Sequence, residues 1–84
     1  MTKEKIYRLK KTRSGMSSTY ETVYEGTLDH LINGVFGYTL RCGASWNRKI
    51  NRNPKTIGAL ITAINKSYEA TEGGYSRSYV KLID

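Results

Sequence analysis

Three short stretches of this 84-residue chain alternate hydrophobic and polar residues with the period of a β-strand. The first stretch, residues 4–12, places Tyr7 and Leu9 on one face, and the other two stretches are residues 19–26 and 76–83. The turn-forming sequence RSGMSS separates the first two stretches. We therefore predict a hairpin in which acids of the second strand lie opposite bases of the first.

After the second strand, the pattern changes to the period of an α-helix. The apolar stripe of this segment consists of Leu28, Leu31, Ile32, Val35 and Cys42, with Phe36 and Leu40 near its edge. Thr27 precedes the stripe and is a favourable N-cap, because its hydroxyl can accept a hydrogen bond from a free N–H group of the first turn. The pattern predicts a helix that begins at Leu28.

The sequence allows two lengths for this helix, because Gly34 and Gly37 would each destabilise a helix interior by about 1 kcal/mol relative to alanine. We predict a single helix that runs to about Arg41 and is ended by Gly43. In the alternative, a short helix ends at Gly34 and residues 36–42 are extended.

A second helix is predicted by apolar residues at positions i, i+3, i+4, i+7 and i+11. These residues are Ile57, Leu60, Ile61, Ile64 and Tyr68. Asn53 is the predicted N-cap and Pro54 the first helical residue, where the missing N–H of proline costs nothing. Residues 71–74, TEGG, are expected to end the helix.

The order ββααβ predicts an α+β fold, with a three-stranded antiparallel sheet and two helices packed on one face. A chain of 84 residues is expected to form one domain, residues 1–84, with a small core. A deep active site is difficult to build in a domain of this size. Binding through an outer surface is the simpler expectation.

The charge of the chain favours an anionic partner. Fourteen Lys and Arg residues against seven Asp and Glu residues give a formal net charge of +7 at pH 7. Residues 3–13 contain six bases and one acid, and residues 41–55 contain five bases and no acid. These two basic segments supply the whole excess of positive charge.

The two basic segments contain the candidate residues for binding nucleic acid, because each Lys or Arg that neutralises a phosphate releases condensed counterions. The candidates are Arg48, Lys49, Arg52, Lys55 and Arg41 in one segment and Lys10, Lys11 and Arg13 in the other. Trp46 has two interpretations: it covers the core, or it stacks on an unpaired base. We favour the core, because a small domain needs its largest apolar side chain.

Catalytic and metal-binding signals are weak in this sequence. His30 is the only histidine, and no motif supplies a partner base or nucleophile. Cys42 is the only cysteine, so neither an internal disulfide nor a Cys/His cluster with zinc spacing is expected. We predict a protein that is not an enzyme and that needs no metal or other cofactor.

The segments GTLDHLI, FGYTLRCG, SWNRKINRNPKTI and GGYSRSYVKLI resemble a group of small basic bacteriophage proteins. In that group a helix beginning G-T-L-x-x-L-I leads to a loop containing K-I-N-x-N-P-K-T-I. The resemblance covers roughly residues 26–83, and its most specific part is the loop and the helix that follows. Size, basicity and pattern are similar to those of the T-even-like phage factors that inhibit the ToxIN toxin–antitoxin system.

This resemblance implies a counter-defence protein that blocks a host toxin ribonuclease in a complex that includes RNA, and it implies no particular binding residues. Two other hypotheses stay open. One is a protein–protein inhibitor that docks its basic face on an acidic host protein without nucleic acid. The other is a DNA-binding phage regulator, although no predicted helix carries bases in the helix-turn-helix manner.

The expected location is the cytoplasm of the host cell. No apolar run approaches the roughly 18 residues that a membrane-spanning helix needs. The N-terminal segment mixes charged and apolar residues and lacks the continuous apolar region of a signal peptide.

Overall fold

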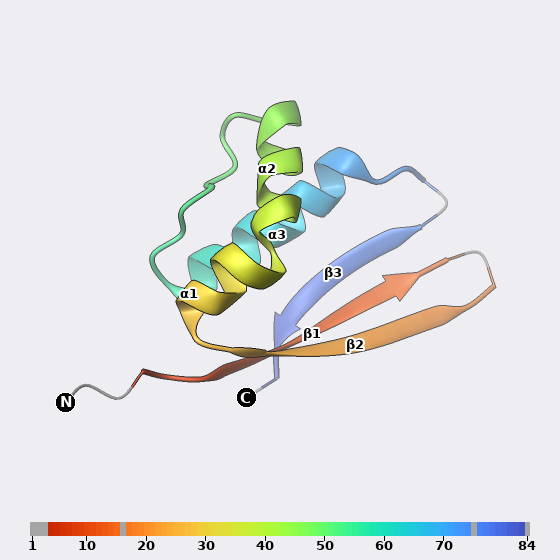
Figure 1. Ribbon diagram of the computed structural model, residues 1–84. Helices are drawn as coiled ribbons and strands as arrows, with labels where there is room; N and C mark the ends of the chain where they lie inside the picture. The colour runs from red at the N-terminus through yellow and green to blue at the C-terminus, as the bar shows by residue number, and fades with distance from the viewer. Residues whose placement is uncertain (1–3, 16, 75, 84) are drawn as a thin grey trace.

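The strands form where the alternating pattern predicts them. The structure is a computed structural model that describes residues 4–15, 17–74 and 76–83. Strand β1 spans Tyr7–Ser14, β2 spans Thr19–Gly26 and β3 spans Arg77–Leu82. Both neighbours of β1 run antiparallel to it, in the order β2-β1-β3 (Figure 1). The predicted α+β class and the antiparallel three-stranded sheet are confirmed.

Bases of β1 face acids of β2 across the hairpin, as predicted. Arg8 Nε lies 3.6 Å from Glu25 Oε2, and Lys10 Nζ lies 3.3 Å from Glu21 Oε2. The carboxylates are more than half exposed, so each pair contributes at most about 1 kcal/mol. The ion pairs help to fix the register of the hairpin rather than to hold the fold together.

Three helices, not the predicted two, connect β2 to β3. The first, α1, spans Leu28–His30 and continues into a π-helical turn, η1, at Leu31–Val35. The second, α2, spans Gly37–Trp46, and the third, α3, spans Ile57–Thr71. All three lie on one side of the sheet (Figure 1). The element order is therefore ββαααβ.

The predicted start at Leu28 with Thr27 as N-cap is confirmed, because Thr27 Oγ1 accepts a hydrogen bond of 3.1 Å from the His30 N–H. Both predicted alternatives for the rest of this segment are wrong. The chain is helical again from Gly37 instead of extended, and the helix continues past Gly43 to Trp46. The break falls at Phe36, which has φ −108° and ψ 7°. Its ring packs edge-on against Tyr24 of β2, with the ring centroids 5.3 Å apart. The break between η1 and α2 therefore directs the Phe36 side chain into the core between the helices and the sheet.

The third helix begins three residues later than predicted. Thr56, not Asn53, is the N-cap, because Thr56 Oγ1 accepts a hydrogen bond of 3.1 Å from the Ala59 N–H. The backbone N–H of Asn53 instead donates to Asn51 Oδ1 at 2.9 Å. Pro54 is buried in the connecting loop rather than placed in the first helical turn. The asparagine and proline thus shape a turn ahead of the helix.

The core lies between the sheet and the helices. The buried apolar residues among those described are Leu9, Leu31, Phe36, Leu40, Ile50, Leu60, Ala63, Ile64, Tyr68 and Val80. The predicted apolar stripe of α3 supplies three of them. Burial raises the pKa of Tyr68 to about 12, so its phenol stays neutral. Lys11 Nζ lies 5.1 Å from the centre of that ring, in a cation–π contact.

In the described part of the chain, no helix is both long enough and apolar enough to cross a membrane.

Candidate nucleic-acid interface

The outer face of α2 carries aromatic and cationic side chains. Tyr38 and Arg41 are three residues apart in α2 and share one face of the helix, and Trp46 is its last residue. Leu40 and Gly43 occupy the opposite side and are buried. The exposed fractions are 73% for Tyr38 and 75% for Trp46, and Arg41 is also exposed. Two large aromatic side chains and one guanidinium group of α2 are therefore in solvent.

The expectation that Trp46 covers the core is wrong. Trp46 is the last residue of α2 and lies on the solvent side of the helix. Phe36, Leu40 and Ile50 fill the core from the same part of the chain. A well-packed core thus forms without Trp46. A large aromatic ring left in water next to basic residues is typical of a binding surface.

Tyr38 joins this surface, although the sequence analysis did not select it. Hydrogen bonding to the Cys42 side chain, one turn further along α2, raises the pKa of the Tyr38 phenol. A tyrosine ring is uncharged at neutral pH with or without this shift, and it is suited to stacking. Tyr38 and Arg41 are three residues apart in the sequence, but they can be placed on one exposed helix face only once residues 37–46 are known to form a helix.

Substituting Trp46 by alanine is expected to change the free energy of unfolding by less than about 0.5 kcal/mol, because the side chain is mostly exposed. The Phe36→Ala variant is the control, since Phe36 is 2% exposed. It should lose about 3–5 kcal/mol, as buried aromatic residues do. Urea unfolding followed by circular dichroism measures both values. A loss of about 2 kcal/mol or more for Trp46→Ala would contradict its placement on the surface.

The loop between α2 and α3, residues 47–56, has a defined shape. Ile50 is 3% exposed, and Pro54 is also buried, so both side chains hold the loop against the domain. Asn47 Oδ1 accepts a hydrogen bond of 3.0 Å from the Lys49 N–H, which forms a turn at the start of the loop. The bond between Asn51 and the Asn53 N–H forms a second turn. The exposed bases of the loop are Arg48, Lys49, Arg52 and Lys55.

No acid lies near these bases in the sequence. Between Asp29 and Glu69 the chain contains no Asp or Glu. The ion pairs of the described residues join β1 to β2 and involve none of the loop bases. We refer to the exposed face of α2 together with loop 47–56 as the α2–loop surface. It combines uncompensated positive charge with exposed aromatic rings.

The second basic segment is separate from this surface. The hairpin tip and loop 47–56 lie at opposite sides of the molecule (Figure 1). Lys10 is paired with Glu21, and Lys11 lies over the ring of Tyr68. Arg13 is exposed near the end of β1. The structure therefore does not bring Lys10, Lys11 and Arg13 next to the loop, and a role for them in binding stays a prediction.

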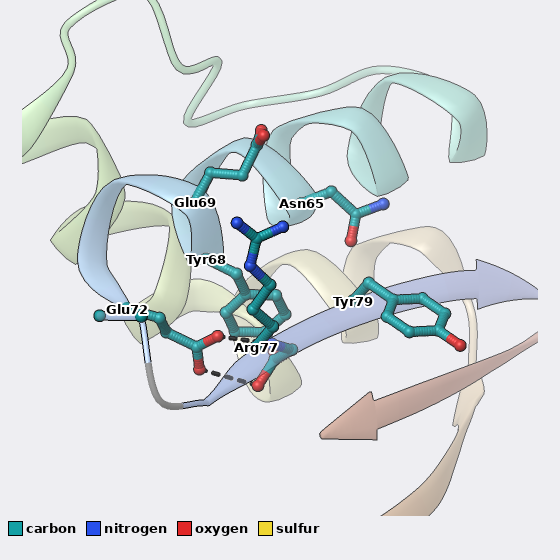
Figure 2. Close-up of a pocket in the computed structure, with 9 residues that line it drawn as sticks. Asn65, Tyr68, Glu69, Glu72, Arg77 and Tyr79 are labelled. Carbon is teal, nitrogen blue, oxygen red and sulfur yellow. Dashed lines mark hydrogen bonds between the residues drawn. The ribbon is translucent and has the colours of Figure 1, made fainter. Parts of the chain in front are cut away.

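A larger hollow of about 650 Å³ lies elsewhere, along the free edge of β3 (Figure 2). Its lining mixes charges: Glu69 and Glu72 come from α3 and its end, and Arg77 comes from the start of β3. Figure 2 shows the Arg77 guanidinium group pointing toward the side of α3 that carries Glu69. This mixture makes the hollow less suited to a polyanion than the α2–loop surface is.

The same region closes the edge of the sheet. Asn65 accepts a hydrogen bond of 2.8 Å from the Val80 N–H and donates one of 3.1 Å to the Val80 carbonyl. Glu72 accepts bonds of 2.6 Å and 2.7 Å from the Ser78 N–H and hydroxyl (Figure 2). These side chains take up backbone groups that would otherwise pair with another strand. The Glu72 carboxylate therefore has a structural task.

The residues considered for catalysis are not assembled into a site in the described part of the chain. Asp29 accepts a hydrogen bond of 2.8 Å from the side-chain amide of Asn33, and His30 is exposed. Cys42 is a free, half-buried thiol. Among the residues described, no three His, Cys, Asp or Glu side chains are grouped so that they could hold a metal ion. The absence of enzymatic activity stays a prediction.

Comparisons with protein-family models, with curated proteins and with solved structures gave no match. The functional argument therefore depends on the residues of this chain and on the sequence resemblance described above.

Proposed function

We propose that this protein binds RNA through the α2–loop surface and acts as a phage counter-defence protein, inhibiting a host toxin ribonuclease in a complex that includes RNA. The observation that carries the RNA-binding part is the exposure of Trp46 beside a segment of bases without acids. Neither feature is required by the fold. The core is complete without Trp46, and the loop is anchored by Ile50 and Pro54.

Each part of the surface has a task in binding a single strand. The phosphate contacts come from five bases: Arg48, Lys49, Arg52, Lys55 and Arg41. Release of counterions from the contacted phosphates makes binding depend strongly on salt. Trp46 stacks on an unpaired base, which is worth about 1–3 kcal/mol per base in single-strand sites. Tyr38 lies about two turns earlier on α2, is also exposed and offers a second platform. The surface has no requirement for a particular base.

The host ribonuclease enters the proposal through the resemblance to phage factors that inhibit ToxIN. A ribonuclease of this kind must bind RNA in order to cut it. A protein that holds the same RNA can therefore join the ribonuclease in one assembly and occupy its substrate. This mechanism needs no catalytic group on the inhibitor.

Affinity purification of the tagged full chain from infected cells tests the proposal. The expected result is that RNA and a host ribonuclease are recovered together, as shown by the ultraviolet absorbance ratio and by mass spectrometry. Complete digestion of the RNA should then release the ribonuclease. A complex that survives this digestion would instead support a direct protein–protein inhibitor. Recovery of DNA without RNA would support a DNA-binding regulator.

A further inference from the structure

A smaller hollow, of about 240 Å³, lies between loop 47–56 and the first half of α3. Gly58, Thr62 and Lys66 follow one another at intervals of four residues, so they form one strip along α3. Lys49 and Asn51 approach from the loop. The volume is about eight times the roughly 30 Å³ that one water molecule takes up in the liquid, which is enough for a phosphate group with part of its hydration shell.

The lining of this hollow is basic and contains no acid. The residues that line it include two bases, Lys49 and Lys66, and two residues with uncharged polar side chains, Asn51 and Thr62. The acid nearest to Lys66 along α3 is Glu69, which lines the other hollow on the side of α3 that faces Arg77 (Figure 2). No ion pair of the described residues involves Lys49 or Lys66. Both charges are therefore available to an anion.

The backbone at the start of α3 adds to this positive potential. Thr56 caps the Ala59 N–H, but helix geometry leaves the Ile57 and Gly58 N–H groups without an intrahelical acceptor. Gly58 has no side chain, and a Cβ atom added there would meet no atom within 4 Å. The backbone at Gly58 is thus open to solvent at the positive end of the helix dipole. This contribution supplements the two lysines.

We propose that this hollow, the Lys49–Lys66 hollow, is a phosphate subsite that holds one phosphate group of the RNA backbone. The inference deepens the proposed function and rests on it for the source of the phosphate. Lys49 is three residues from Trp46 in the chain, so their Cα atoms are at most about 11 Å apart. One RNA strand can therefore stack a base on Trp46 and place a neighbouring phosphate in the hollow. Lys66, which lies outside the two basic segments, becomes a binding residue.

The salt dependence of RNA binding tests whether the two lysines share one phosphate. For single strands, each neutralised phosphate contributes about 0.7 to the slope of log K against log salt. If the two lysines share one phosphate, the Lys49→Ala/Lys66→Ala double variant should reduce the magnitude of this slope by about 0.7. If each lysine contacts its own phosphate, the reduction should be about 1.4. The matched control is Lys5→Ala/Lys81→Ala, which removes the same charge from exposed positions outside the hollow. It should leave the slope nearly unchanged.

Titration of the full chain with inorganic phosphate tests the subsite without RNA. In amide proton–nitrogen correlation spectra, the Gly58 and Ala59 signals should shift and saturate. The same signals should stay in place in the Lys49→Ala/Lys66→Ala variant and shift normally in the control variant. Circular dichroism and urea unfolding should show that both double variants keep the fold, because all four substituted side chains are exposed.

The outcomes separate the subsite from the proposed function. If RNA binds the parent protein but the Lys49→Ala/Lys66→Ala variant matches the control in slope and affinity, the hollow is not the subsite and Lys49 contacts no phosphate. RNA binding through the other bases of the α2–loop surface then stands. If the parent protein binds no RNA but phosphate shifts the Gly58 amide signal, the proposed RNA binding is wrong. The hollow then binds a phosphate group that comes from another source. If phosphate causes no saturable shift and the slope is unchanged, the subsite is overturned.

Discussion

The triple variant Arg48→Ala/Lys49→Ala/Arg52→Ala is expected to lose most of its affinity for single-stranded RNA while keeping its fold. These side chains are exposed, and the ion pairs of the described residues involve none of them. Loss of three phosphate contacts should reduce the magnitude of the slope of log K against log salt by about 2. If the variant and the parent protein bind equally at 1 M salt, this difference in slope makes the variant bind on the order of 10²- to 10³-fold more weakly than the parent at 50 mM salt. Fluorescence anisotropy at several salt concentrations measures both quantities.

The second basic segment supplies the matched control for this experiment. The variant Lys10→Ala/Lys11→Ala/Arg13→Ala removes the same charge, but Lys10 and Lys11 are already engaged with Glu21 and Tyr68. Its effect on affinity should be clearly smaller. If the loop variant bound RNA undiminished at every salt concentration, the assignment of the site to loop 47–56 would be wrong. Equal losses for both variants would mean that RNA extends over both sides of the molecule.

Gly43→Ala is expected to lower the free energy of unfolding by about 2–3 kcal/mol, as overpacking at a tight contact does. Gly43 is buried where α2 crosses α3, next to Ser67, which is fully buried. A Cβ atom at position 43 would lie 2.7 Å from the Ser67 Cα atom and closer still to the Ser67 side chain. Because part of this contact is backbone, a change of rotamer cannot relieve it. The two helices would have to move apart.

Gly58→Ala makes the same chemical change at an open position and is the control. A Cβ atom added at Gly58 meets no atom within 4 Å, and the residue lies in the first turn of α3. This variant should gain about 0.5–1 kcal/mol, because alanine restricts the unfolded chain more than glycine does. Urea unfolding of both variants compares them directly. Similar stabilities for the two variants would show that α2 and α3 do not approach each other closely at Gly43.

The sequence predicted the sheet well because each strand carries its own signal. Alternation, turn residues and opposite charges act between neighbours in the chain, so β1 and β2 could be paired without knowledge of the rest. The start of α1 after Thr27 was also predicted correctly, but the start of α3 was harder, because Asn53 and Thr56 are both favourable caps. Burial of Pro54 and the turn at Asn51 decide between them, and both depend on packing of the loop.

Gly43 was misjudged for a related reason. A glycine after an apolar helical stripe is a common end signal, and its sequence context does not distinguish an end from a close helix crossing. Here the missing side chain makes room for Ser67 on α3, so the helix continues to Trp46. That extension carries Trp46 out to the solvent face.

The candidate site was predicted only in part. The bases of loop 47–56 were selected correctly as exposed residues, because four bases without an acid are easily recognised in a sequence. The sequence did not show that the hairpin bases lie on the other side of the molecule (Figure 1). It also did not select Tyr38 or Lys66, whose positions relative to the loop depend on how α2 and α3 pack.

The fluorescence of the protein shows whether single-stranded RNA binds at Trp46. Trp46 is the only tryptophan, so its emission reports on this one position. Titration of the full chain with an unstructured oligouridine should quench the emission in a saturable way, and the midpoint should rise steeply with salt. A Trp46→Ala variant should bind the same RNA about 5- to 150-fold more weakly, the equivalent of about 1–3 kcal/mol. RNA binding with unchanged emission, or no binding at low salt, would contradict the account.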